Sequence, residues 1–343
     1  MATRRRGLVL LVALAIVGGL ALVEHQRLAG LRILPSAGDR AVVVAPGSSV
    51  TAIGNGLAAA GIVADAGDFT LVYRLWGGAR PLRAGEYAIA PGTTLRELID
   101  RMQAGAVIQH ALTVVEGMTV RELRLRLQAE PALVRTLDGV ADRDLMAALG
   151  LPAGHPEGRF LPDTYRFPRG TTDRDFLRRA NAALERALAA AWAQRATGLP
   201  LADPTELLTL ASVVEKETGI ASERSTIAGV FTRRLQLGMR LQTDPTVIYG
   251  LGARFDGNLR KQDLMTDGPY NTYTRHGLPP TPICLPGRDA LLAVARPAAG
   301  DALYFVASGD GGHVFSATLA QHNAAVRRYL DSLRARRRVG GGR

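Results

Sequence analysis

The sequence predicts an α+β protein with an apolar helix at its N-terminus, then a small βα module and a larger mixed α/β domain. An uncharged apolar run covers residues 7–23. Short β-rich runs, each followed by a glycine turn and an amphipathic helix, recur up to about residue 128. Beyond residue 156, apolar helices alternate with segments rich in proline, glycine and aromatic residues, which is typical of helices joined by ordered loops.

Composition sets the first limits on the class of protein. The chain has 343 residues, enough for two domains and a short anchor, and 47% of them are apolar, which favours packed cores over disorder. Its formal net charge of +11 favours polyanionic surroundings, namely nucleic acid, anionic lipid or an acidic polymer. The single cysteine, Cys284, excludes an intrachain disulfide and a cysteine-based metal site, and we interpret it as a small buried residue.

The N-terminal run predicts a membrane anchor. Arginines occupy positions 4–6 before it, and Glu24 ends it. Its length suits both a short spanning helix and a signal-peptide core, but no small-residue cleavage pattern follows, which favours an uncleaved anchor. The preceding arginines predict an N-in orientation. We therefore expect a single-pass protein of the inner (plasma) membrane, with most of the chain in the periplasm or extracytoplasmic space.

Three segments share one pattern of β-rich run, glycine turn and helix with a hydroxyl residue at its N-cap. They cover residues 42–50, 87–95 and 113–120. We expect the first two to form one module over residues 41–110, after a linker at residues 24–40, and the third to begin the next domain. The pattern resembles LysM-like modules, which bind N-acetylglucosamine polymers. Strand–glycine–helix units also occur in many unrelated folds, so the pattern alone does not decide whether this module binds sugar.

A predicted buried helix ends at two glutamates. Asp203 is placed to cap it and Pro204 to occupy its first turn. The turns that follow are apolar nearly all round, and they lead directly to Glu215 and Glu217. A carboxyl in an apolar cleft has a raised pKa, as a general acid near neutral pH requires. Periodicity does not separate the two glutamates, and both could simply mark where the helix surfaces.

Turn-rich segments supply further polar and aromatic candidates. They cover residues 157–168, 238–250 and 270–282, and their mixture of amide, hydroxyl, carboxyl and aromatic groups is typical of a sugar cleft. The first could equally be a structural connection between helices. The end of the chain predicts a hairpin over residues 303–317, a helix from about Leu319, and a basic tail at residues 331–343.

These blocks together resemble the MltG (YceG-like) endolytic murein transglycosylase family. The matching segments are residues 211–218, 240–250, 270–273, 277–280, 311–315 and 322–323. With the anchor and the LysM-like module in the family's order, the resemblance spans nearly the whole chain. It implies that residues 111–330 form a catalytic transglycosylase domain after a cytoplasmic N-terminus at residues 1–6. Arg159 departs from the pattern, because family members often carry an aromatic residue there.

The resemblance implies a peptidoglycan lyase that cleaves the MurNAc–GlcNAc bond within glycan strands, leaves 1,6-anhydro-MurNAc ends, and terminates nascent strand elongation. The family's catalytic glutamate falls on Glu215, the first of the pair. One carboxyl group can serve both proton transfers, because no water enters the reaction, unlike in most glycosidases. No metal or organic cofactor is needed, and peptidoglycan synthases are implied as partners. The candidates for substrate binding are Glu157, Gln242, Asp244, Tyr270, Asn271 and Tyr273.

Two other functions remain compatible with the sequence. A hydrolase would use the same cleft with water as acceptor, and Asp244 or Glu217 as its second carboxylate. A non-catalytic cell-wall-binding scaffold would use only the LysM-like module, although the intact glutamate block disfavours it. A nucleic-acid binder is disfavoured by the predicted orientation and by the lack of any known nucleic-acid-binding motif.

Overall fold

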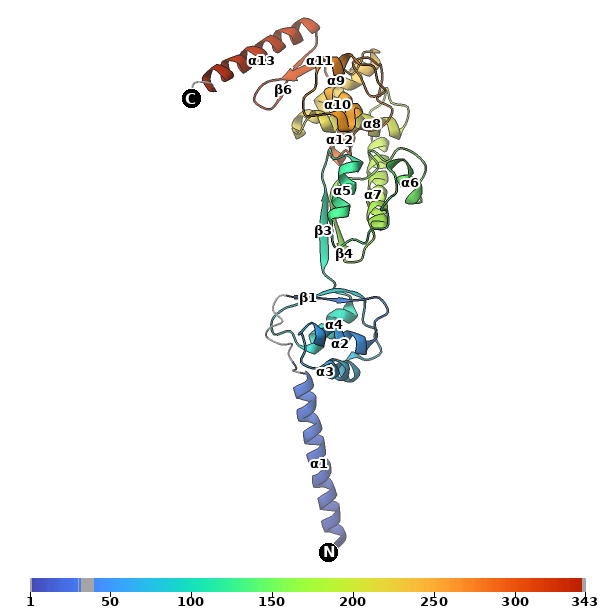
Figure 1. The fold of residues 1–343 in the computed structure, drawn as a ribbon, viewed down its shortest axis with the longest axis vertical. Helices are drawn as coiled ribbons and strands as arrows, with labels where there is room; N and C mark the ends of the chain where they lie inside the picture. The colour runs from blue at the N-terminus through green and yellow to red at the C-terminus, as the bar shows by residue number, and fades with distance from the viewer. Residues whose placement is uncertain (1, 30, 32–39, 341–343) are drawn as a thin grey trace. The chain divides into compact units, whose positions relative to one another are not determined.

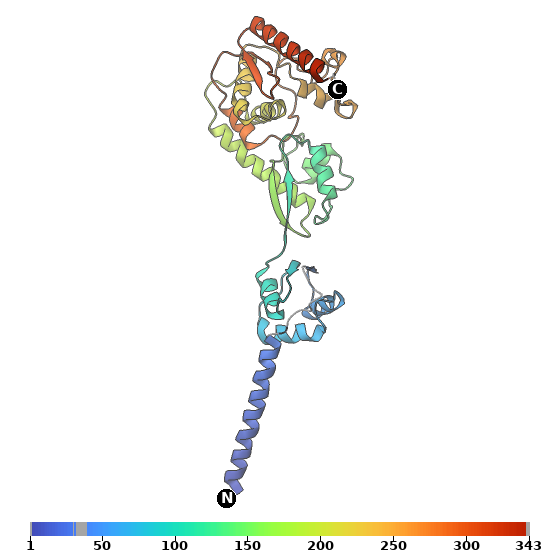
Figure 2. The same cartoon turned by 90° about the vertical axis from the view of Figure 1, so that its left-hand side faces the viewer.

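A computed structural model describes residues 2–29, 31 and 40–340, and the side chains of residues 12–25, 31 and 40–334. The fold is α+β, as predicted, and its described strands form three separate two-stranded sheets (Figures 1 and 2). Contacts divide the chain into two compact units. Unit 1 comprises residues 1–111 and 166–171, and unit 2 comprises residues 112–165 and 172–343.

Unit 1 contains a two-stranded sheet, five helical segments and an apolar core. Its elements are α1 (Ala2–Ala29), β1 (Arg40–Val44), α2 (Val50–Ala59), α3 (Ala66–Val72), the π-helical turn η2 (Tyr73–Gly77), β2 (Gly85–Ile89) and α4 (Leu95–Ala104). Strand β1 pairs with β2 antiparallel, and Val42 lies opposite Tyr87. The core includes Leu57, Phe69 and Leu98, which are all buried. Ser49 and Thr94 cap α2 and α4, which confirms the two predicted hydroxyl caps in this unit.

Helix α1 covers the predicted anchor. Its described side chains from Val12 to Val23 include several large apolar ones that are exposed. No helix in the described part of the chain is long and apolar enough to cross a membrane. Part of the expected anchor, most of the linker and the end of the tail lie outside the residues whose side chains are described.

Unit 2 is mainly helical. Its first elements are β3 (Gln109–Val114), α5 (Val120–Ala129), η3 (Asp142–Asp144), α6 (Leu145–Ala148), β4 (Asp163–Pro168) and α7 (Asp173–Ala193). Then come α8 (Pro204–Glu217), η4 (Ala221–Glu223), α9 (Arg224–Gln236), α10 (Asp244–Leu251), η5 (Gly252–Arg254), α11 (Lys261–Met265) and α12 (Arg288–Ala295). The last are β5 (Tyr304–Ala307), β6 (His313–Ser316) and α13 (Leu319–Gly340). Strand β3 pairs with β4, and the boundary between the units falls within these two strands.

Helix α8 lies at the centre of this unit, against α7, α9 and α12. It begins as predicted, because Asp203 accepts a hydrogen bond from Glu206 N at 3.0 Å and Pro204 occupies the first turn. Residues 207–214 are all buried, which confirms the prediction of a buried helix. The predicted hairpin is also confirmed, since β5 and β6 pair antiparallel with Phe305 opposite Phe315.

Candidate active site

The end of α8 directs three consecutive side chains to different surroundings. Successive residues of an α-helix project about 100° apart. Glu215, Lys216 and Glu217 therefore point away from one another, each toward other elements of unit 2. The next residue, Thr218, has an extended backbone, so the helix ends here.

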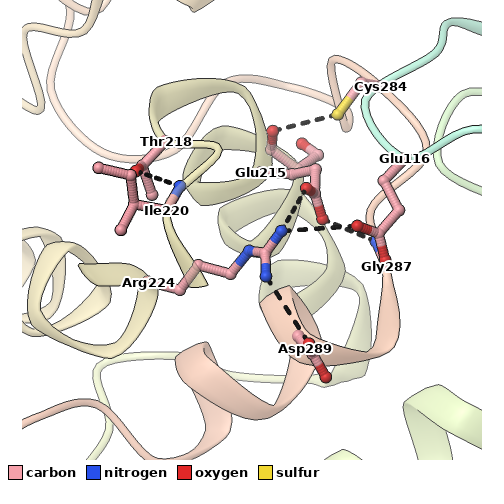
Figure 3. Close-up of polar contacts among 9 residues, drawn as sticks. Glu116, Glu215, Thr218, Ile220, Arg224, Cys284, Gly287 and Asp289 are labelled. Carbon is pink, nitrogen blue, oxygen red and sulfur yellow. Dashed lines mark hydrogen bonds and ion pairs between the residues drawn. The ribbon is translucent and has the colours of Figure 1, made fainter. Parts of the chain in front are cut away.

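Glu215 is held by donors on both carboxylate oxygens (Figure 3). Its Oε1 accepts from Arg224 Nη2 at 3.4 Å, and its Oε2 accepts from Gly287 N at 2.9 Å. The Arg224 guanidinium also reaches Glu116 Oε2, at 3.5 Å. Only 5% of the Glu215 side chain is exposed, and this burial raises its pKa, as does the nearby Glu116, while Gly287 and Arg224 act in the opposite direction. Glu215 is thus part of an ion-pair network.

Glu217 accepts a hydrogen bond from Thr243 Oγ1 at 2.6 Å. Burial raises its pKa, and the neighbouring Asp244 raises it further, whereas Thr243, His313 and Arg234 favour the ionised form. A buried carboxyl with a raised pKa carries its proton at higher pH than an exposed one, which is the property of a general acid.

Glu217 lines a pocket of about 540 Å³, which we call the Glu217 pocket. Its lining residues are Glu217, Arg234, Leu241, Gln242, Asp244, Tyr273, Tyr304, Phe305, Val306, Ala307, His313, Leu319, His322 and Asn323. The pocket thus combines carboxyl, amide, imidazole and aromatic groups. Tyr273 OH donates to Asp244 Oδ1 at 2.6 Å, which fixes both side chains.

Gln242 has a backbone φ of 53°, the only positive value among the described residues other than glycine. Such a conformation is unfavourable for a residue with a Cβ and is often found at functional sites. Two contacts hold it, a hydrogen bond from Gln242 N to Thr272 O at 3.1 Å and one from Arg234 Nη1 to Gln242 Oε1 at 3.4 Å.

A larger pocket of about 860 Å³ lies elsewhere in unit 2, and we call it the Lys216 pocket. Its lining residues are Thr119, Val120, Arg121, Glu122, Asp142, His155, Pro156, Glu157, Lys216, Pro245, Ile248, Tyr249, Gly252, Ala253, Phe255, Tyr270 and Ile283. The rings of Tyr249 and Tyr270 meet edge to face, with centroids 4.9 Å apart. Tyr270 OH is also 2.8 Å from Thr281 Oγ1.

Glu157 is a buried acid in the Lys216 pocket, only 4% exposed. Its carboxyl group accepts from Val120 N at 2.9 Å and from Tyr249 OH at 3.2 Å. Burial outweighs these two hydrogen bonds and raises the pKa of Glu157 to about 7. The group therefore titrates near neutral pH.

The six predicted substrate-binding residues do not gather around one glutamate. Gln242, Asp244 and Tyr273 line the Glu217 pocket, whereas Glu157 and Tyr270 line the Lys216 pocket. Asn271 is buried, and its Nδ2 donates to the carbonyls of Asp263, Leu264 and Thr266. It therefore holds a loop in place. Glu215 instead lies in the network with Arg224 and Gly287.

Sequence reasoning missed several residues of the site. Arg224 follows Glu215 by nine residues, and the short helix η4 that returns it to Glu215 had no clear pattern in the sequence. Gly287 has no side chain, and a Cβ there would lie 1.9 Å from Glu116 Oε1. His313 does stand in a matched segment, and that was a usable signal. Within the described residues, no cluster of three or more His, Cys, Asp or Glu side chains could hold a metal ion.

Comparison with known proteins gives related sequences and a related structure. The model of the YceG-like family matches residues 42–328. The endolytic murein transglycosylase of Bacillus subtilis is 31% identical over 303 residues, which cover 83% of each chain. That of Streptococcus pneumoniae is 28% identical over 325 residues, and the match covers 85% of this chain but 58% of the relative.

A crystal structure of a YceG-like protein from Listeria monocytogenes superimposes with a TM-score of 0.54 at 29% identity. The match covers 83% of this chain and 98% of the Listeria chain. The family model extends from unit 1 to the last helix, and the Bacillus relative also matches most of the sequence. The chain therefore belongs to the YceG-like family.

Proposed function

We propose that the chain is an endolytic murein transglycosylase, a lyase that cleaves the MurNAc–GlcNAc bond within glycan strands. The name of the Bacillus relative supports this activity, since the two chains match over 83% of their lengths. The observation that carries the proposal is the Glu217 pocket. It places a buried carboxyl group beside the hydroxyl, amide and aromatic groups that bind sugars.

We assign the acid/base role to Glu217, and this differs from the sequence-based prediction of Glu215. Both oxygens of Glu215 already accept hydrogen bonds, one of them from a guanidinium, and these contacts favour its ionised form against the effect of burial. Glu217 is bound by one hydroxyl and faces a pocket with Gln242, Asp244 and Tyr273. The prediction of Glu215 remains the competing assignment, with Glu215 as the proton donor and Glu217 as a binding residue.

In the proposed reaction, protonated Glu217 donates its proton to the glycosidic oxygen. The bond from that oxygen to C1 of MurNAc breaks, and GlcNAc leaves with a free hydroxyl group. The Asp244 carboxylate, held by Tyr273, stabilises the positive charge that develops at C1. The Glu217 carboxylate then takes the proton of the muramyl C6 hydroxyl, whose oxygen bonds to C1. The product carries a 1,6-anhydro ring, and Glu217 is protonated again.

Three further roles belong to this proposal. Helix α1 anchors the chain in the inner membrane with the catalytic unit outside the cytoplasm, which is supported by the exposed apolar side chains of residues 12–23. The module at residues 41–110 positions glycan strands in a LysM-like manner. Peptidoglycan synthases are its partners, since strand cleavage would terminate the elongation that they carry out.

Mass spectrometry of the products tests the reaction class. Purified uncrosslinked glycan strands are incubated with the detergent-solubilised full chain, and the new ends are analysed. Lysis predicts 1,6-anhydro-MurNAc ends and no uptake of ¹⁸O from labelled water. Reducing ends that carry ¹⁸O would instead identify a hydrolase, and no cleavage by a folded protein would favour the cell-wall scaffold.

A further inference from the structure

The Lys216 pocket and the Glu217 pocket share a wall. Lys216 lines the first pocket and its neighbour Glu217 the second, where α8 ends. In the same way Pro245 lines the first and Asp244 the second, where α10 begins. Because adjacent residues face different pockets at two places, the pockets adjoin there. A polymer that extends from the Glu217 pocket past the ends of α8 and α10 would reach the Lys216 pocket.

The carboxylates of the Lys216 pocket are already bound within the protein. Glu122 Oε2 accepts from Thr119 N at 2.7 Å, as part of the capping box of α5. Asp142 forms an ion pair with Arg124. Glu157 accepts the two hydrogen bonds described above, and its pKa of about 7 leaves it partly protonated at neutral pH. Asp142 is thus neutralised by Arg124 and Glu157 is partly protonated, whereas Glu122 keeps its negative charge because its donors are neutral.

Two cations that line the pocket, Lys216 and Arg121, have no carboxylate partner among the described residues. Within the described residues, no carboxylate lies within ion-pair distance of Lys216 or Arg121, and Lys216 Nζ only donates to Gly117 O, at 3.3 Å. Lys216 is also unusual in composition, because the sequence has 42 cationic residues and only Lys216 and Lys261 are lysines. An ammonium on a flexible stem is a compact charge that can turn toward a ligand anion.

We propose that the Lys216 pocket binds the carboxylate-bearing substituent of MurNAc, with Lys216 and Arg121 as its ligands. This substituent is the 3-O-lactyl group. In peptide-free strands its own carboxylate is free. In other strands it carries a stem peptide, which has carboxylates of its own. The inference rests on the proposed murein substrate.

Equilibrium binding to a turnover-deficient protein tests this site. Full-length Glu217→Gln protein is titrated with fluorescent glycan strands that carry stem peptides, that are stripped of them, or whose carboxylates are converted to amides. Lys216→Gln is then added to this background, with Lys216→Arg as the charge-conserving variant. Lys261→Gln is the matched control, since it removes the only other lysine, which is exposed and lies outside both pockets.

Lys216→Gln is expected to weaken binding of carboxylate-bearing strands by about tenfold, the range of one hydrogen bond to a charged group. Amidated strands should bind both proteins equally, Lys216→Arg should retain most of the affinity, and Lys261→Gln should change nothing. A loss that persists on peptide-free strands identifies the lactyl carboxylate, whereas a loss only on peptide-bearing strands identifies the stem peptide.

Equal affinity of Lys216→Gln and its parent for every strand would overturn the proposal, as would an equal loss on amidated and unmodified strands. Thermal melting of each variant separates a binding defect from a folding defect. The assay does not depend on the bond that is cleaved. If wild-type protein released no anhydro ends while the carboxylate-specific loss remained, the proposed function would fail and the anion site would stand.

Discussion

At the scale of single residues, three carboxyl groups in the described part of the chain have a raised pKa because they are buried. They are Glu157, Glu215 and Glu217, and each lies in unit 2. Their partners differ, because Glu157 is bound by a backbone N–H and a tyrosine, Glu215 by a guanidinium and a backbone N–H, and Glu217 by a threonine. A raised pKa alone therefore does not identify the catalytic group. The contacts and the pocket that each acid faces distinguish the three.

The raised pKa of Glu157 predicts that the free energy of unfolding depends on pH. Its pKa is about 7 in the folded chain against a reference value of 4.5, so the folded state holds this proton more tightly than the unfolded state. The associated stability is complete below pH 4.5 and is lost as the pH rises through about 7, which amounts to about 3 kcal/mol.

Glu157→Gln removes this titration while keeping an oxygen that can accept from Val120 N. We expect the unfolding free energy of the variant, relative to wild type, to rise steadily between pH 4 and pH 8. Urea denaturation across this range measures it, with the exposed Asp138→Asn as the control for general effects of charge. A difference between Glu157→Gln and wild type that stays constant with pH would contradict the assignment.

At the scale of elements, α8 determines where the candidate catalytic groups lie. Its N-cap Asp203 satisfies Glu206 N, and loss of such a cap destabilises a protein by about 1 kcal/mol. Asp203→Ala should lower the free energy of unfolding by this amount, while Asp203→Ser, which can still accept the hydrogen bond, should lose much less. Chemical denaturation of unit 2 measures both. Equal losses in the two variants would show that the cap does not stabilise α8.

The local features of this helix were predictable, but the choice between its two glutamates was not. Asp203 and Pro204 set the start of α8 through contacts within one turn, so the local sequence is sufficient to predict where the helix begins. The surroundings of Glu217 come from residues 234–244, Tyr273 and residues 304–323, which are distant in the sequence. Arg224 reaches Glu215 only because η4 turns the chain back. Tertiary contacts therefore decide which carboxyl group faces a pocket.

At the scale of the whole molecule, an apolar helix is followed along the chain by a small βα unit and a larger helical unit. The family match extends through the last two. The proposed topology places the larger unit outside the cytoplasm. A reporter that is active only outside the cytoplasm, fused after Arg343, should be active in cells that express the full chain. The same fusion without residues 1–29 should be inactive. Activity of a cytoplasm-specific reporter at the same position would contradict the predicted N-in anchor.

In the proposed reaction, one carboxyl group, on Glu217, carries out both proton transfers of strand cleavage. Glutamine at this position keeps the shape of the side chain but cannot donate and retrieve a proton, and general acid–base catalysis contributes roughly two to four orders of magnitude. Removal of a buried carboxyl should not destabilise the fold, so the melting temperature serves as the folding control.

The most direct measurement is the rate of anhydromuropeptide release by Glu217→Gln and Glu215→Gln, assayed beside wild type on the same glycan strands. We predict that Glu217→Gln loses at least about a hundredfold in rate with an unchanged melting temperature. Glu215→Gln should retain more activity than Glu217→Gln. Any loss of rate in Glu215→Gln should come from its weakened contacts to Arg224 and Gly287. An active Glu217→Gln beside an inactive, folded Glu215→Gln would return the catalytic role to Glu215.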